Sequence, residues 1–114
     1  MTTLVAVTMY LALDAAPLYC GGVVDYAADW VAWDFAVNGG QCGDIIRITA
    51  GGVTREYPAL DSGRFGRHCV MQLDGTCPRI AVDVPHHVAW FDGMSTVGKV
   101  VNLSERARYE EYPE

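Results

Sequence analysis

The sequence predicts a mainly-β domain in which short strands close into a small barrel. The chain has 114 residues, which is the size of one domain. Its 12 glycines are spread along the chain and separate short apolar runs. Few segments show the periodicity of apolar residues that is typical of an amphipathic helix. Short strands at close spacing with many glycines favour a closed barrel over a sandwich. We therefore expect one domain over residues 1–114, with one or two short helices.

The expected strands follow from apolar runs bounded by turn residues. The clearest is DIIRIT over residues 44–49, and a Gly51-Gly52 turn joins it to a second strand over 53–57 as a hairpin. The remaining expected elements are strands over 4–13, 70–73, 79–84 and 99–103, a short helix or irregular segment over 26–33, a helical turn or strand over 87–91, and a short helix from 104.

The charge of the chain excludes several classes of partner. The formal net charge is -6, with 14 acidic and 8 basic residues. A nucleic-acid binder needs a basic face to meet phosphates, and an anionic lipid surface would repel this chain, so we expect neither partner. No apolar run approaches the length of a membrane span. The N-terminus has no positive segment before its interrupted apolar stretch, and therefore no clear signal peptide.

Four cysteines in a small chain fit two disulfides in an oxidising compartment. Of the three ways to pair them, the local one joins Cys69 to Cys77 around Gly75 and leaves Cys20 with Cys42. A zinc site would use C-x2-4-C pairs, which are absent, and four free thiols in a cytosolic protein are the other alternative. Disulfides without a clear signal peptide predict an extracytoplasmic or virion-associated protein.

Three aspartates share an unusual setting. Asp34 in VAWDF, Asp61 in PALDSGRFG and Asp83 in RIAVDVP each end or interrupt an apolar run, where a carboxylate is rare. A carboxylate there needs hydrogen bonds or keeps its proton, and a proton held near neutral pH is what a general acid needs. The alternative is that each aspartate caps a turn or accepts backbone N–H groups. We expect all three to line one shared cleft.

The order of these motifs resembles a known family. Residues 31–34 match its V-A-x-D element, residues 61–66 are similar to D-T-G-x-x-I-K-G, and residues 79–83 are loosely similar to R-I-D-V. Residues 42–44 stand where the family has a P-L-G-T turn. From about residue 19 to 84 the chain resembles the three-aspartate (3D) domain, a double-psi β-barrel related to the catalytic barrel of one class of lytic transglycosylase. The resemblance implies a six-stranded double-psi barrel.

The chain departs from the family pattern at two places. The stretch between the second and third aspartates is longer and contains Cys69 and Cys77, which fits an insertion pinned by a disulfide. After Asp83 the family continues with a segment of Phe and Gly, whereas this chain has Pro85 followed by His86 and His87. Adjacent positions of an extended chain point to opposite faces, so we expect no metal at the histidine pair and no cofactor.

The resemblance implies a chemistry for the three aspartates. The related enzymes cut the β-1,4 bond between N-acetylmuramic acid and N-acetylglucosamine in peptidoglycan and form an anhydro-sugar without water. Asp83 is then the acid/base. Asp61 orients Asp83 or raises its proton affinity as a nearby like charge. Asp34 is a structural partner that accepts backbone N–H groups.

Aromatic and basic side chains supply the expected contacts to a peptidoglycan glycan strand. Tyr19, Trp30, Trp33 and Trp90 are candidates to stack on sugar faces, and Arg64 is a candidate to meet a carboxylate of the peptide stem. The alternatives are core aromatics and a solvated turn.

A second function class remains open, because a fold does not settle a function. The same barrel serves equally as a non-catalytic structural or binding module that keeps its aspartates for folding. Such a module would belong to a larger protein assembly, for example as a virion or phage tail component.

Overall fold

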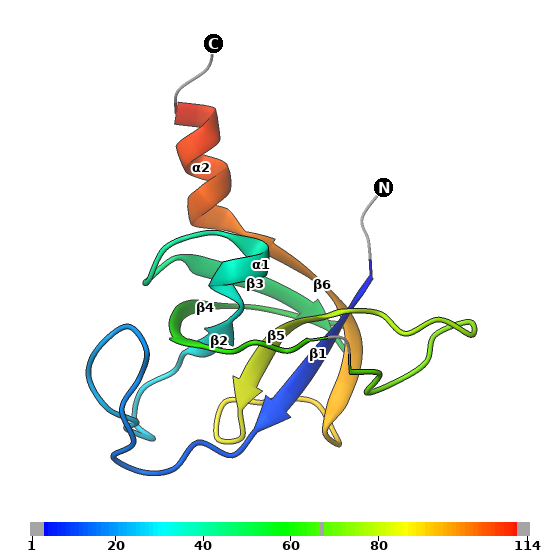
Figure 1. Ribbon diagram of the computed structural model, residues 1–114, viewed down its shortest axis with the longest axis horizontal. Helices are drawn as coiled ribbons and strands as arrows, with labels where there is room; N and C mark the ends of the chain where they lie inside the picture. The colour runs from blue at the N-terminus through cyan, green and yellow to red at the C-terminus, as the bar shows by residue number, and fades with distance from the viewer. Residues whose placement is uncertain (1–3, 67, 112–114) are drawn as a thin grey trace.

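The computed structural model describes residues 4–66 and 68–111 and shows six strands that close into a barrel (Figure 1). The order around the barrel is β1-β5-β2-β4-β3-β6. The strands are β1 (Val5–Tyr10), β2 (Val31–Trp33), β3 (Ile45–Ala50), β4 (Val53–Ser62), β5 (Ile80–Pro85) and β6 (Ser95–Asn102), and the helices are α1 (Phe35–Asn38) and α2 (Leu103–Glu111). The expected mainly-β class, with a closed barrel and short helices, is confirmed.

The barrel combines two parallel pairs with four antiparallel pairs and has two long loops on the outside. The pairs β1–β5 and β2–β4 are parallel, and the other four pairs are antiparallel. Only β3 and β4 are both paired and consecutive in the chain, so they are the pair that a tight turn joins as a hairpin. The loop over residues 11–30 joins β1 to β2, and the loop over 63–79 extends from the barrel before β5 (Figure 1).

The barrel interior is filled by branched aliphatic side chains at alternate strand positions. Val7, Ile46, Ile48 and Val82 are each 0% exposed and belong to one core cluster. Alternation is required because successive side chains of a strand point to opposite faces of the wall. At Gly98 of β6 an added Cβ would lie 2.6 Å from a backbone oxygen of β3, so the close approach of these two strands needs a glycine.

A second, smaller core lies outside the barrel wall, under the 11–30 loop. Trp30 is 0% exposed there and packs with Ala12 and Val24, and partly buried side chains such as Leu18 and Leu60 surround them. The loop is thus a packed part of the fold with its own apolar contacts, which allows it to hold polar groups in place against the wall.

Two disulfides pin the two long loops, in the pairing that the sequence favoured. Cys20–Cys42 ties the 11–30 loop to the connection between α1 and β3, and Cys69–Cys77 closes a short ring within the 63–79 loop. The described chain has no free cysteine. Disulfides of this kind fit an oxidising environment outside the cytoplasm.

Several expected elements differ from those observed. Residues 70–73 form no strand: the eight-residue separation of Cys69 and Cys77 bends the chain through a turn at Asp74 and Gly75 and leaves only an isolated bridge. The helix considered over 26–33 is absent, because its last three residues are the strand β2. Helix α1 has only four residues and was not expected. Among the described residues, no helix is long and apolar enough to cross a membrane.

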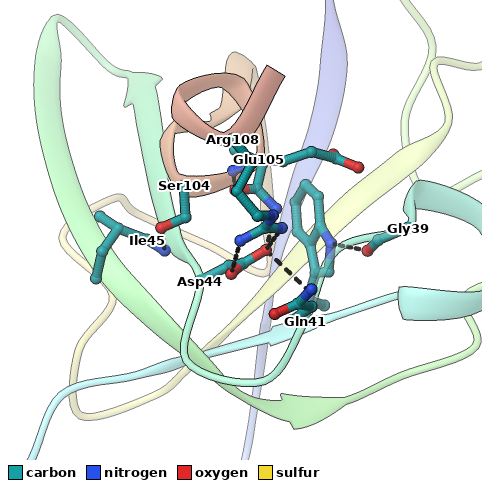
Figure 2. Close-up of polar contacts among 9 residues, drawn as sticks. Gly39, Gln41, Asp44, Ile45, Ser104, Glu105 and Arg108 are labelled. Carbon is teal, nitrogen blue, oxygen red and sulfur yellow. Dashed lines mark hydrogen bonds and ion pairs between the residues drawn. The ribbon is translucent and has the colours of Figure 1, made fainter. Parts of the chain in front are cut away.

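Helix α2 is anchored to the barrel by the carboxylate of Asp44 (Figure 2), a residue that is 5% exposed. Arg108 donates to both carboxylate oxygens at 2.9 and 2.8 Å, and Asn102 Nδ2 and the backbone N–H of Gln41 donate at 2.9 Å each. The hydrogen bonds from Arg108 are the main cause that lowers the pKa of Asp44 from 3.8 to about 2, against the opposing effect of burial. Asn102 and Gln41 fix the carboxylate from β6 and the loop before β3, and the two hydrogen bonds from Arg108 then tie the nine-residue helix α2 to it.

We expect Asp44→Asn to lower the free energy of unfolding at neutral pH by about 1–3 kcal/mol, because it removes charge-assisted hydrogen bonds. The folded-state pKa lies below the ordinary value, so this stabilisation is present above about pH 4 and is lost as the pH falls towards 2. The measurement is urea unfolding of both proteins at several pH values.

The matched control is Glu56→Gln, which removes the exposed pair between Glu56 and Arg47. An exposed ion pair contributes less than about 1 kcal/mol to the free energy of unfolding. An Asp44→Asn variant no less stable than this control at pH 7 would contradict the anchoring role.

Candidate functional site

The strand register brings Asp61 and Asp83 to either side of one residue. Ala32 of β2 pairs with Asp61 of β4 on one side and with Asp83 of β5 on the other, and Thr8 of β1 is the next partner of Asp83. Val82 is fully buried in the barrel core, so its neighbour Asp83 points to the outer face of the wall. The two carboxylates that the sequence singled out thus meet on the outside of the barrel, beside the 11–30 loop.

Asp61 is held by three donors. The Tyr10 hydroxyl donates to Oδ2 at 3.1 Å, and the backbone N–H groups of Tyr19 and Ser62 donate to Oδ1 at 3.2 and 3.0 Å. Two of these donors come from β1 and the 11–30 loop, far away in the sequence. The carboxylate is therefore fixed in position, and it fixes the loop in return.

Asp83 is half-buried, and its surroundings raise the pKa of its carboxyl group. Its Oδ1 accepts a hydrogen bond of 2.8 Å from the Thr8 hydroxyl, which also lies 3.3 Å from the Val82 carbonyl oxygen. Burial is the main cause that raises the pKa of Asp83, the negative charge of Asp61 raises it further, and the Thr8 hydrogen bond opposes both. Asp83 therefore keeps its proton to a higher pH than an ordinary aspartate.

Tyr10 binds Asp61, and the charge of Asp83 contributes to its raised pKa, a role that the sequence reasoning missed. Its hydroxyl donates to Asp61 and accepts a hydrogen bond of 2.9 Å from Nε1 of Trp30. Burial above all, then the charges of Asp61 and Asp83, raise the pKa of Tyr10 well above its ordinary value, so the phenol stays neutral and donates. Thr8 and Tyr10 stand two residues apart in β1 and so share a face, which is the pattern that could have identified them.

Asp34 has a local role instead of a place in the carboxylate pair. It is 5% exposed, it is the N-cap of α1, and its Oδ1 accepts the Val37 N–H at 3.2 Å. An aspartate is a preferred N-cap because it satisfies an otherwise unpaired amide of the first turn. This agrees with the structural part that the resemblance implies for Asp34.

The three tryptophans named from the sequence all lie in packed surroundings. Trp30 is 0% and Trp33 4% exposed, and their indole N–H groups donate to Tyr10 and to the Gly39 carbonyl. Trp90 is half-buried and stacks on Tyr57 at a centroid distance of 6.0 Å. Trp30 and Trp33 are thus core aromatics, which was the stated alternative, and Trp30 contributes to the site only through Tyr10.

Tyr19 and Arg64 are the exposed members of the expected binding set. Tyr19 is 65% exposed, and its ring stacks on Phe35 with 5.6 Å between the ring centroids. Its backbone N–H donates a hydrogen bond to Asp61. Arg64 is exposed in the loop that follows β4, three residues after Asp61. Tyr19 therefore presents a ring face to solvent beside the carboxylate pair.

The histidine pair after β5 holds the 11–30 loop. His86 Nδ1 accepts the Ala12 N–H at 3.2 Å, and His87 Nε2 lies 2.8 Å from the Ala28 carbonyl oxygen. The Tyr26 ring packs edge-on against both imidazoles, at 5.4 and 5.2 Å. In the part of the chain that the structure describes, no group of three or more His, Cys, Asp or Glu side chains is arranged to hold a metal ion.

The carboxylate pair lies apart from two hollows in the described structure. These hollows have volumes of about 520 and 490 Å³ and are lined by residues of α1, α2 and the segments beside them. Neither Asp61 nor Asp83 lines either hollow. The site is a feature of the barrel wall, and a ligand that reached Asp83 would lie along the outside of the barrel.

We expect two substitutions to move the pKa of Asp83 in opposite directions. Thr8→Val removes the hydrogen bond that lowers this pKa, so the pKa rises. Asp61→Asn removes the like charge that raises it, so the pKa falls. The measurement is an NMR titration of the side-chain carboxyl carbons.

Thr49→Val is the matched control for the threonine, because the Thr49 hydroxyl pairs with Thr54 on the β3–β4 hairpin. We expect no change of the Asp83 pKa in this variant. Shifts of the same sign in Thr8→Val and Asp61→Asn would contradict the arrangement described.

A scan of the sequence against protein-family models gives no match, and neither does a search of curated proteins. The resemblance to the three-aspartate domain therefore rests on its short motifs and on the closed barrel.

Proposed function

We propose that the chain is a double-psi β-barrel of the three-aspartate type that cleaves peptidoglycan as a lytic transglycosylase, with Asp83 as the acid/base. One observation carries the proposal: the half-buried Asp83, with its raised pKa, stands one strand away from the carboxylate of Asp61. Enzymes place a carboxyl beside a second charge and in a partly desolvated position when it must deliver a proton near neutral pH.

The strand arrangement supports the finer fold name. The two parallel pairs, β1–β5 and β2–β4, are interleaved around the barrel by the antiparallel pair β2–β5. Asp34 directly follows β2, Asp61 is the next-to-last residue of β4, and Asp83 is within β5. Each motif of the resemblance thus occupies a separate strand or strand end, as expected of a double-psi barrel whose site is built from several strands.

The proposed reaction needs one carboxyl group and no water. Asp83 gives its proton to the glycosidic oxygen as the bond to C1 of N-acetylmuramic acid breaks, which releases the hydroxyl of N-acetylglucosamine. The resulting carboxylate then takes the proton of the muramic 6-hydroxyl, whose oxygen bonds to C1 and closes the anhydro ring. The carboxyl returns to its starting state, so one group acts as acid and then as base.

The neighbours of Asp83 take supporting parts in this proposal. Asp61, fixed by three hydrogen bonds, places a negative charge that raises the proton affinity of Asp83. The Tyr10 hydroxyl holds Asp61 in position, and the Thr8 hydroxyl holds Asp83. The exposed ring of Tyr19 offers a stacking face for a sugar, and Arg64 offers a cation to the peptide stem.

We expect Asp83→Asn to slow the release of anhydromuropeptides from peptidoglycan by about 10²- to 10⁴-fold, because the amide neither gives nor takes the proton. The measurement is digestion of purified peptidoglycan by the oxidised protein, with the products identified by mass spectrometry.

Asp92→Asn is the matched control, since Asp92 is exposed in the segment between β5 and β6 and lies outside the site. It should release products at the wild-type rate. No release from a folded wild type with both disulfides intact would refute the enzyme and leave the second function below.

The second candidate is a structural or binding barrel within a larger assembly, such as a virion or phage tail part. The observation in its favour is that Asp34 and Asp61 are already used in internal hydrogen bonds that hold α1 and the 11–30 loop. Aspartates retained for folding would show this pattern without any substrate. Both candidates agree with the two disulfides, which fit an extracytoplasmic or virion-associated location.

A further inference from the structure

The hollow of about 490 Å³ lies where α1, the start of β5, the end of β6 and the first turn of α2 meet. Its lining contains one basic side chain, Arg79, and one acidic side chain, Glu105, together with two amides and apolar groups. A volume of this size accommodates a small molecule. The site of the proposed reaction does not use it, since neither Asp61 nor Asp83 lines it.

Arg79 brings a positive charge that has no carboxylate partner among the described residues. Its Nη1 donates to Asn38 Oδ1 at 2.7 Å, and Asn38 Nδ2 in turn donates to the Ala81 carbonyl at 3.2 Å. The amide is therefore fixed between β5 and α1, and it holds the guanidinium at the edge of the hollow. The remaining N–H groups of Arg79 are available to a bound anion.

Glu105 brings the opposite charge from the other side. Its backbone N–H donates to Asn102 Oδ1 at 2.9 Å, as in an N-cap of α2. Its side chain points away from the Asp44–Arg108 pair (Figure 2), and a Cβ added to Gly39 would lie 3.4 Å from Glu105 Oε1. No hydrogen bond from another described residue reaches this carboxylate. The charge of Glu105 contributes to the raised pKa of Arg108, but that guanidinium already donates hydrogen bonds to both oxygens of Asp44.

Arg79 and Glu105 lie beside two adjacent residues at the C-terminal end of α1. Arg79 contacts Asn38, and the Glu105 carboxylate lies beside Gly39. Val37, which is 71% exposed, and the half-buried Val100 supply an apolar part of the lining. A ligand that carries one anionic and one cationic group would satisfy both charges, whereas a simple anion or cation would leave one of them facing a like charge.

We propose that this hollow binds a small zwitterion, namely a free α-amino acid or a short peptide. The ligand's carboxylate lies on the Arg79 guanidinium, its ammonium group on the Glu105 carboxylate, and its aliphatic side chain against Val37 and Val100. Arg is suited to the first contact because its planar guanidinium binds a carboxylate through two parallel hydrogen bonds. The inference stands on these residues alone and does not depend on the proposed function.

The test is an NMR titration of the full-length oxidised protein with alanine, alanyl-alanine and trialanine. These probes present the same two charges at increasing separation, so the best binder reports the spacing of the site. The side-chain amide signals of Asn38 and Asn102, both in the lining, are the reporters. We expect saturable shifts of these signals with at least one probe. The absence of saturable shifts with all three would overturn the proposal.

Blocked peptides and matched variants separate this site from general surface binding. N-acetyl-alanyl-alanine lacks the ammonium group and alanyl-alaninamide lacks the carboxylate. The affinity of each should therefore be at least about tenfold lower than that of alanyl-alanine. Arg79→Gln and Glu105→Gln should weaken the zwitterion similarly, with the fold checked by the backbone spectrum. Arg47→Gln, which changes an arginine paired with Glu56, should leave the affinity for the zwitterion unchanged. Blocked peptides that bind as well as the zwitterion, or an equal loss in Arg47→Gln, would also overturn the proposal.

Discussion

The three-residue strand β2 is the constraint on which the barrel and its carboxylate pair both depend. It pairs with β4 in parallel and with β5 in the antiparallel sense, and all three of its residues are buried. Because Ala32 has a partner on each side, the register of one short strand decides that Asp61 and Asp83 are neighbours. A slip by one residue would turn a core side chain outward and separate the two carboxylates.

The parts of the fold that could be predicted are those whose cause is local. The β3–β4 hairpin was predictable because alternating residues and two glycines lie within one short stretch, and the run that forms β5 was predicted from its apolar residues. Strand β2 was not, since three residues are too few to show a period. Residues 70–73 had strand composition but no partner strand, because the Cys69–Cys77 ring turns the chain back on itself.

The candidate site was predicted in part for a similar reason. Asp61 and Asp83 stood out because a carboxylate in an apolar run is rare, and that is visible in the sequence. Tyr10 is an ordinary aromatic in an apolar strand until the fold brings it against Asp61, 51 residues away. Asp34 shared the sequence pattern of the other two but follows a strand that leads into a helix, so its oxygen caps that helix.

The Cys20–Cys42 bond links the 11–30 loop to the segment before β3 and lies next to Tyr19, whose N–H is on Asp61. In a reducing compartment this link is open, and the hydrogen bonds of the loop alone must keep the donor against the carboxylate. Completion of the site is then tied to the place where thiols oxidise. In a chain whose Cys20–Cys42 bond is reduced, the 11–30 loop would hold Asp61 less firmly. The geometry of the carboxylate pair would then depend on whether the chain is in a reducing or an oxidising environment.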